Sequence, residues 1–200
     1  RLNKNVDNFY LDSNSIVYDC LRALEKEYNG NDEQFEKKLI EAVCIKIDEY
    51  IKIIKPKKLV FIAFDGVAPV AKLEQQRNRR YKSYLLTFLK NEFEKQPDKW
   101  DKTAITPGTN FMEKLANYTK HYYHNKEKKY NIKNFIVSTS DEPGEGEHKL
   151  FGYIRDNKAA HSKEVSMIYG LDADLIMLAL NHLPISKQIY LYRETPEFIK

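Results

Sequence analysis

Two patterns of apolar and polar positions alternate along this chain. Residues 59–64 (LVFIAF) are apolar throughout, as in a strand that is covered on both faces of a parallel sheet. Between such runs, apolar residues recur every three or four positions, which predicts helices. Strands are expected near 6–12, 59–66, 134–140, 165–171 and 188–194, and helices over 13–28, 31–55, 68–93, 111–123, 146–156 and 174–180. The alternation predicts an α/β fold with a mostly parallel sheet flanked by helices.

Two polar segments lie outside these elements. Residues 96–108 contain Pro97, Pro107 and Gly108 and are expected to form a loop. Trp100 in this loop, beside Lys99 and Lys102, is either a binding group or an anchor. The lysines at 126, 128 and 129 are interpreted as an exposed helix end, with RNA contact as the alternative.

Composition narrows the class of protein. The chain has 200 residues, of which 42% are hydrophobic and 31% charged, as in soluble globular proteins. No apolar run approaches the roughly 20 residues that cross a bilayer, and residues 1–8 lack a signal-peptide core. Cys20 and Cys44 have no metal-ligand spacing. These features predict an intracellular protein without a membrane segment, in the cytoplasm rather than the nucleus.

Six carboxylates stand where apolar runs end: Asp12, Asp65, Glu145, Glu147, Asp172 and Asp174. The carboxyl ends of parallel strands meet at one edge of a sheet, where ligands bind. Acids gathered there repel one another unless a hard divalent cation neutralises them, which indicates a magnesium site. Each acid alone could be a helix cap, as Asp172 could for the helix that follows. Two pairs spaced by one residue, with Gly144 and Gly146 beside the glutamates, are harder to explain by capping.

The helix expected after Asp65 carries a basic face. Positions i, i+4, i+7 and i+8 hold Lys72, Gln76, Arg79 and Arg80. Such donors suit a terminal phosphate, and a solvated basic face is the alternative. A separate stripe, expected to pack against the sheet, holds Leu73, Tyr81, Tyr84 and Phe88. The net charge of +4 is small, so the clustering of charge carries more information than its sum.

Other catalytic arrangements are absent from the sequence. It contains no Ser-His-Asp order, no nucleophilic cysteine context and no phosphate-binding glycine loop. The five histidines make no ligand pattern and are expected at the surface or around the acids; they are His121, His124, His148, His161 and His182. His148 follows Glu147 and is a candidate to support it.

Five segments together resemble the XRN family of 5′-to-3′ exoribonucleases. In family order they are FYLDSNSIVYD, FIAFDGVAPVAKLEQQRNRRY, AITPGTNFM, EPGEGEHKLFGYIR and YGLDADLIMLAL. The resemblance implies a PIN-like or flap-nuclease-like domain over residues 1–200, with the six acids as catalytic metal ligands. It further implies two Mg²⁺ ions, with Mn²⁺ as a substitute, and single-stranded RNA with a 5′ monophosphate as substrate.

The resemblance also assigns roles to individual residues. It implies that Lys72, Gln76, Arg79 and Arg80 bind the 5′ phosphate. Tyr18 stands where the family usually has a histidine and is expected to stack on the first base. Asn14 is expected either to orient the neighbouring backbone or phosphate or to cap a helix.

Departures from the family leave other functions open. Val70 replaces a basic residue. The family also has a short segment before the first aspartate strand and a further acidic ligand later in its chain, so the domain is expected to be incomplete at both ends. An RNA-binding or structural module without turnover, or a flap-type DNA endonuclease, are the alternatives.

Overall fold

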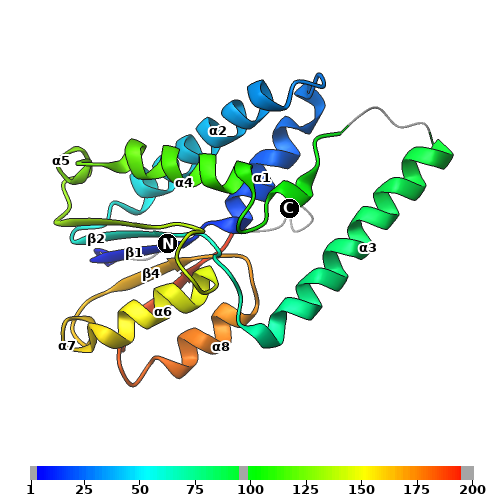
Figure 1. Ribbon diagram of the computed structural model, residues 1–200. Helices are drawn as coiled ribbons and strands as arrows, with labels where there is room; N and C mark the ends of the chain where they lie inside the picture. Colours follow the sequence, from blue (N-terminus) through cyan, green and yellow to red (C-terminus); the bar gives the residue numbers. More distant parts are fainter. Residues whose placement is uncertain (1–3, 95–98, 195–200) are drawn as a thin grey trace.

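The computed structural model describes residues 4–94 and 99–194, which form a five-stranded sheet flanked by helices (Figure 1). The strands are β1 (Asn8–Asp12), β2 (Leu59–Ala63), β3 (Asn134–Ser138), β4 (Ser166–Tyr169) and β5 (Ile189–Tyr192). Their order is β3-β2-β1-β4-β5, and all four pairings are parallel. The prediction of an α/β fold with a mostly parallel sheet is confirmed.

Helices cover both faces of the sheet. They are α1 (Asn14–Leu24), α2 (Asp32–Ile54), α3 (Val70–Glu94), α4 (Asn110–Tyr123), α5 (Glu127–Tyr130), α6 (Gly146–Asp156), α7 (Lys158–His161) and α8 (Asp174–Asn181). Two short 3₁₀ turns are η1 (Glu25–Glu27) and η2 (Lys102–Ala104). In Figure 1, α1, α2 and α4 lie on one side of the sheet, and α6 and α8 lie on the other. The chain reverses its winding between β1 and β4, and ligands of such sheets bind beyond the carboxyl ends of the strands at this point.

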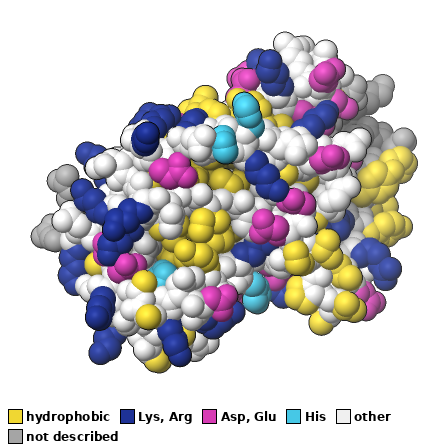
Figure 2. Space-filling view, turned by 60° about the vertical axis from the view of Figure 1, so that its left-hand side comes forward, with side chains coloured by type: hydrophobic (Ala, Val, Ile, Leu, Met, Phe, Trp, Pro, Cys, Tyr) yellow, Lys and Arg dark blue, Asp and Glu magenta, His cyan; other side chains and the backbone are white. Residues whose placement is uncertain are grey.

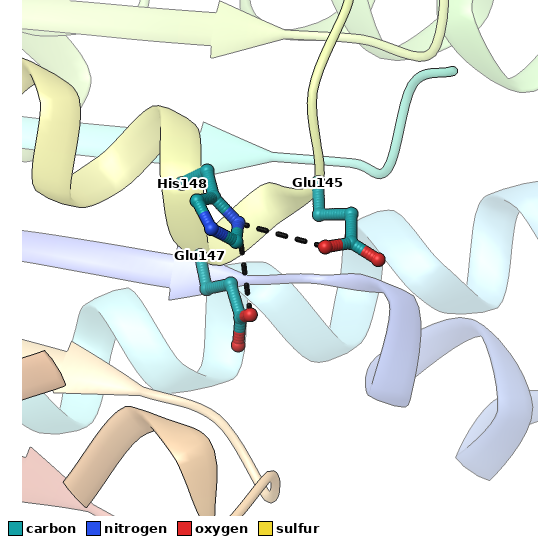
Figure 3. Close-up of side chains that lie close together, drawn as sticks. All are labelled: Glu145, Glu147 and His148. Carbon is teal, nitrogen blue, oxygen red and sulfur yellow. Dashed lines mark ion pairs between the residues drawn. The ribbon is translucent and has the colours of Figure 1, made fainter. Parts of the chain in front are cut away.

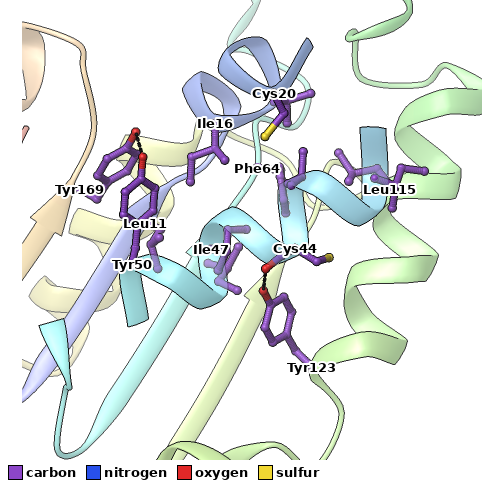
Figure 4. Close-up of a cluster of buried hydrophobic side chains, with 14 of the residues drawn as sticks. Leu11, Ile16, Cys20, Cys44, Ile47, Tyr50, Phe64, Leu115, Tyr123 and Tyr169 are labelled. Carbon is purple, nitrogen blue, oxygen red and sulfur yellow. Dashed lines mark hydrogen bonds between the residues drawn. The ribbon is translucent and has the colours of Figure 1, made fainter. Parts of the chain in front are cut away.

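The larger core lies between the sheet and the layer of α1, α2 and α4 (Figure 4). On β1, Phe9 and Leu11 point into this core, whereas Tyr10 points into the smaller core under α6 and α8, as the alternation of a strand requires. Hydroxyl groups inside the larger core are paired. Tyr123 donates a hydrogen bond to the Cys44 carbonyl at 3.0 Å, and the Tyr50 and Tyr169 hydroxyls are 3.2 Å apart. The smaller core fixes α6 and α8. Each of these helices has one acid in its first turn and a second acid just before it, so together they position four of the six acids.

Helix α3 departs from the expected packing. The stripe that was expected to pack against the sheet is exposed, from 42% at Leu73 to 66% at Tyr81, with Tyr84 and Phe88 between these values. Figure 1 shows the reason, because α3 leaves the edge of the sheet and projects away from the body. Among the described residues it makes no extended packing contact with another element. The prediction of a buried stripe is therefore wrong.

The segment before α4 is ordered by its own contacts. Trp100 is buried, with ring centroids 5.8 Å from Phe35 and 5.0 Å from Phe111, so it is an anchor rather than a binding group. The loop expected over 96–108 contains η2, while residues 95–98 lie outside the described part.

His121, His124 and His148 are exposed, whereas the other two histidines are buried. His161 and His182 are buried, which contradicts the expectation of a surface position or a position around the acids. His161 pairs with the Tyr10 hydroxyl, and His182 lies 3.1 Å from an Arg155 nitrogen. These two histidines are part of the packing around α6, α7 and α8.

No described helix combines the length and the apolar character needed to cross a membrane.

Candidate active site

The six acids lie at the carboxyl edge of the sheet. Asp12 is the last residue of β1, Asp65 follows β2, and Asp172 follows β4. Glu145 precedes α6, Glu147 lies in its first turn, and Asp174 begins α8. All six line one cavity of about 290 Å³, together with Lys72, Gln75, Gln76 and Arg79. The structure therefore brings together acids from four separate segments of the chain.

The electrostatics of this cavity favour a bound cation. Burial, and then the charge of Asp65, hold the pKa of Asp12 well above its usual range. Burial likewise raises the pKa of Asp65, and burial together with Asp172 raises the pKa of Glu147 to about 7. Within the described residues, Oδ1 of Asp12 is buried and has no hydrogen-bond partner. Carboxylate oxygens are the ligands that Mg²⁺ and Mn²⁺ accept, so this donor set fits a divalent metal site.

Glu145, Glu147 and His148 form the part of the site shown in Figure 3. One possible ligand atom from each of the three lies within 4.8 Å of the others. Nδ1 of His148 is 3.6 Å from Glu145 and 3.7 Å from Glu147. Glu147 is buried, whereas His148 is exposed. His148 thus lies beside both glutamates but is not among the residues that line the acid cavity.

Gly146 allows α6 to begin in contact with two aspartates. Its backbone N–H donates a hydrogen bond to Oδ1 of Asp65 at 2.7 Å. A Cβ atom at this position would lie 2.5 Å from Oδ1 of Asp12, closer than real Cβ contacts. The glycine between the two glutamates is therefore required by close approach.

Asn14 fixes the position of Asp65. The side-chain Nδ2 of Asn14 donates to Oδ2 of Asp65 at 2.7 Å, and the backbone N–H of Asp65 donates to Oδ1 of Asn14 at 3.0 Å. The N-cap of α1 is Ser13, so the helix-cap interpretation of Asn14 is wrong. Asp172 does make a local contact, because its Oδ1 accepts from the Asp174 N–H at 3.1 Å. That bond leaves the other carboxylate oxygen of Asp172 for a ligand.

The basic face of α3 borders the acids. Lys72 forms an ion pair with Glu145 at 2.7 Å, and Arg80 donates to Gln76 at 3.2 Å. Gln76 and Arg79 also line a second, adjoining cavity of about 840 Å³, which Arg80 and Tyr18 line as well. The structure thus places all four predicted phosphate ligands at two connected cavities.

Tyr18 lies in the wall of the larger cavity and is exposed, at 39%. Burial raises the pKa of its hydroxyl, while the charges of Arg79 and Arg80 act in the opposite direction. The ring of Tyr18 therefore lies near the two arginines of α3.

Three contributions to the site were not predicted from the sequence. Lys149 donates hydrogen bonds to the carbonyls of Phe64 and Thr139, both at 2.8 Å, and so joins the ends of β2 and β3 to α6. Lys149 lies four residues after Glu145, so the sequence places it on the same side of α6 as that acid and could have indicated a position near the site. Gln75 and Lys102 line the cavities without any such signal in the sequence.

Basic residues away from the cavities have other partners. Figure 2 brings the side of α5 and α7 forward, and on this face basic side chains are interspersed with acidic ones. Lys126 lies 3.0 Å from the ring centroid of Tyr122, and Lys129 pairs with Asp48 at 3.2 Å. These contacts agree with the interpretation of residues 126–129 as a helix end.

A parallel α/β sheet with clustered carboxylates at its carboxyl edge and a basic helix beside them is typical of metal-dependent enzymes that cleave phosphate esters. The family model described as the XRN 5′-3′ exonuclease N-terminus matches residues 1–195. The chain belongs to this family.

Curated relatives agree with this assignment. Over 193 residues the chain is 39% identical to 5′-3′ exoribonuclease 1 of Saccharomyces cerevisiae, covering 88% of this chain and 12% of the relative. It is 36% identical to 5′-3′ exoribonuclease 2 of Schizosaccharomyces pombe, covering 87% of this chain and 20% of the relative. It is also 36% identical to human 5′-3′ exoribonuclease 1, covering 87% and 11%. The chain thus spans a fifth or less of the length of these relatives.

Proposed function

We propose that this chain acts in a Mg²⁺-dependent 5′-to-3′ exoribonuclease that hydrolyses single-stranded RNA with a 5′ monophosphate. One observation carries the proposal: a single cavity holds all six acids together with Lys72, Gln76 and Arg79 of the basic helix. A metal-ligand set and a phosphate-ligand set that share a cavity suit a substrate whose terminal phosphate lies close to the bond that is cut.

The acids and the basic helix would divide the work. The six carboxylates would hold Mg²⁺, or Mn²⁺ in its place, which when bound supplies an activated water and neutralises charge on the scissile phosphate. Asn14 and the Gly146 N–H hold the Asp65 carboxylate in place for this purpose. Gly146 also keeps side-chain atoms away from the buried oxygen of Asp12.

Lys72, Gln76, Arg79 and Arg80 would hold the 5′ phosphate. A guanidinium offers paired donors that match phosphate oxygens, and the lysine adds a point charge. Tyr18, in the adjoining cavity, would stack on the first base, since every base has a face that an aromatic ring can cover. A 5′ phosphate held beside the metal ligands places the first linkage at the acids, which would give the direction of cleavage. The two cysteines form no disulfide, which fits a reducing compartment.

Degradation of defined oligonucleotides tests this function. The chain would be incubated with RNA and DNA of one sequence, each with a 5′ phosphate or a 5′ hydroxyl, in Mg²⁺ or in EDTA. We expect mononucleotides to be released from the 5′-phosphorylated RNA in Mg²⁺. We expect no release from the other three substrates, or from any substrate in EDTA. Binding without degradation would instead support an RNA-binding module, and internal cuts in branched DNA would support a flap-type endonuclease.

Matched variants make the test specific to the site. Glu147→Gln and Asp172→Asn are each expected to lower the rate by at least about a hundredfold, because each removes a charge from the proposed metal ligands. Asp141→Asn is the control, because this exposed acid pairs with Lys120 and does not line the acid cavity. A nuclease activity that survived both site substitutions would come from elsewhere in the sample.

A further inference from the structure

The larger cavity has a wall that the proposed function does not use. One side of this cavity is formed by Tyr18 of α1, and a second side is formed by Arg79 and Arg80 of α3. A third side comes from the segment before α4, through Lys102, Thr103 and Pro107. In Figure 1 this segment runs beside α1, and α3 stands on its other side. These three walls and the ends of β2 and β4, through Asp65 and Asp172, together line the cavity.

The third wall is built as a rigid unit. Trp100 is buried against Phe35 and Phe111 and anchors the start of the segment. Asp101 then accepts hydrogen bonds from the Thr103 N–H at 2.9 Å and from the Thr103 hydroxyl at 2.7 Å. At the other end, the Thr109 hydroxyl lies within hydrogen-bonding distance of the Ala104 and Thr106 carbonyls. Residues 101–109 are thus held by their own side chains and do not need a ligand to order them.

Lys102 is the cation of this wall. It lies on η2, it is exposed, and its ammonium takes part in no ion pair or side-chain hydrogen bond with residues 4–94 or 99–194. Lys99, three residues earlier, differs in both respects, because it pairs with Glu25 at 3.3 Å and does not line the cavity. One of two neighbouring lysines is therefore free to meet a ligand that enters the cavity.

We infer that Lys102 binds an internal backbone phosphate of the RNA strand whose 5′ end the proposed function places at α3. A backbone phosphate is the ligand that an unpaired ammonium on a cavity wall would bind in a single strand, because phosphates repeat at every nucleotide while bases vary. The cavity of about 840 Å³ holds more than a single phosphate group. The cavity adjoins the acids through Asp12, Asp65 and Asp172, so a strand leaving the site would pass this wall. This role rests on the proposed function for the position of the strand, and it adds a contact that does not depend on the terminal phosphate.

Equilibrium binding of single-stranded RNA tests the role of Lys102. Fluorescence anisotropy would be recorded in Ca²⁺, with labelled RNA carrying either a 5′ phosphate or a 5′ hydroxyl, over a range of salt concentrations. Lys102→Ala is expected to weaken binding of both RNAs by a similar factor, about five- to tenfold, and to reduce the slope of log affinity against log salt by about 0.7. Lys102→Arg is expected to restore most of the affinity.

Lys99→Ala is the matched control. It removes the same charge from the same segment. Its partner Glu25 lines the cavity and is left unpaired, so a small loss of affinity is expected, less than about twofold, with no change in the salt slope. Circular dichroism melting would verify that both alanine variants are folded, which is expected because both lysines are exposed. Equal effects of the two alanine substitutions would overturn the inference, because they would indicate a general effect of net charge.

Two further outcomes separate this inference from the proposed function. A loss confined to 5′-phosphorylated RNA would overturn the inference, because it would assign Lys102 to the terminal-phosphate pocket. If the unmodified chain binds both RNAs equally, the proposed recognition of the 5′ phosphate fails. The contrast between Lys102→Ala and Lys99→Ala would still decide the role of the wall.

Discussion

A Cβ atom on Gly146 would lie 2.5 Å from Oδ1 of Asp12, an oxygen that is buried and has no hydrogen-bond partner among the described residues. We expect Gly146→Ala to displace Asp12 or the start of α6. The Mg²⁺ concentration for half-maximal activity, or for half-maximal stabilisation against heat, should rise at least about tenfold, as when a group that orients metal ligands is removed. Titration with Mg²⁺ during thermal melting gives this value without relying on turnover.

Gly152→Ala is the control on the same helix. A Cβ there would meet only Arg155 at 3.7 Å, which is an ordinary contact. This substitution should leave Mg²⁺ binding unchanged and should stabilise the chain by about 0.5–1 kcal/mol, because alanine favours a helix over glycine. Similar effects of the two substitutions would show that Gly146 is required only for the helix and not for the acids.

At the scale of single residues, the sequence predicted the acids better than the groups that hold them. Each acid follows an apolar run, so its position at the edge of a sheet could be inferred locally. The bond between Asn14 and Asp65 joins residues 51 positions apart, and no local pattern encodes it. The need for glycine at 146 likewise depends on Asp12, which comes from another strand.

Among the elements, α6 and the ends of β2 and β3 are joined by one ammonium group. Lys149 donates to the Phe64 and Thr139 carbonyls, and burial lowers its pKa. Lys149→Met keeps most of the aliphatic stem but leaves both carbonyls without this donor. We expect the free energy of unfolding to fall by about 2 kcal/mol, as for loss of a charged hydrogen bond. Urea denaturation monitored by circular dichroism measures this loss.

Lys120→Met provides the comparison for Lys149. Lys120 pairs with Asp141 at an exposed site, so its removal should cost less than about 1 kcal/mol. If the two substitutions have the same effect, the bond from Lys149 to the strand ends adds no more stability than a surface ion pair.

Helix α3 shows where a helical pattern stops being informative. Its sequence predicted a helix and a basic face, but it could not predict the direction in which the helix leaves the sheet. A stripe of Leu73, Tyr81, Tyr84 and Phe88 has the spacing of a buried face, yet burial depends on whether another element lies opposite. That condition is set by tertiary structure and is absent from the local sequence.

The exposure of α3 leads to a stability test. Tyr84→Ser and Phe88→Ser should each change the free energy of unfolding by less than about 0.5 kcal/mol, as for exposed positions. Phe111→Ala, in the larger core, should cost about 3–5 kcal/mol in the same urea denaturation experiment. A loss at Tyr84 or Phe88 comparable to that at Phe111 would mean that α3 packs against the body of the molecule.

At the scale of the whole molecule, the strand order determines which acids meet. The apolar runs predicted strands, and their alternation with helices predicted parallel pairing. The order β3-β2-β1-β4-β5 places β1 between β2 and β4, so Asp12 stands between the segments that carry Asp65 and Asp172. The sequence alone does not determine this order, because several parallel arrangements would satisfy the same local patterns. The cavity wall at Lys102 depends on the same long-range arrangement.

Because the acids converge, the stability of the whole chain should depend on pH and on metal together. Burial and mutual repulsion raise the pKa values of Asp12, Asp65 and Glu147, the last from 4.5 to about 7. These groups bind protons more tightly when the chain is folded than when it is unfolded. The contribution of Glu147 to stability is therefore complete below pH 4.5 and is lost as the pH rises through about 7. The contributions of Asp12 and Asp65 are complete below their ordinary pKa of 3.8 and are lost at higher pH.

In EDTA, the free energy of unfolding should fall between pH 5 and pH 7, with a slope of up to about 1.4 kcal/mol per pH unit for each proton involved. Mg²⁺ should oppose this fall, because it replaces the protons that the carboxylates lose, so its stabilising effect should be larger at pH 7 than at pH 5. Glu147→Gln should make the slope in EDTA shallower. Asp141, whose pKa is lowered to about 2, titrates below this range and does not interfere. Urea denaturation at pH 5, 6 and 7, in EDTA and in Mg²⁺, measures the free energy of unfolding of the unmodified chain and of Glu147→Gln. If stability in EDTA does not change over this range, or if Mg²⁺ stabilises the chain equally at pH 5 and pH 7, the acids do not repel one another strongly enough to form the proposed metal site.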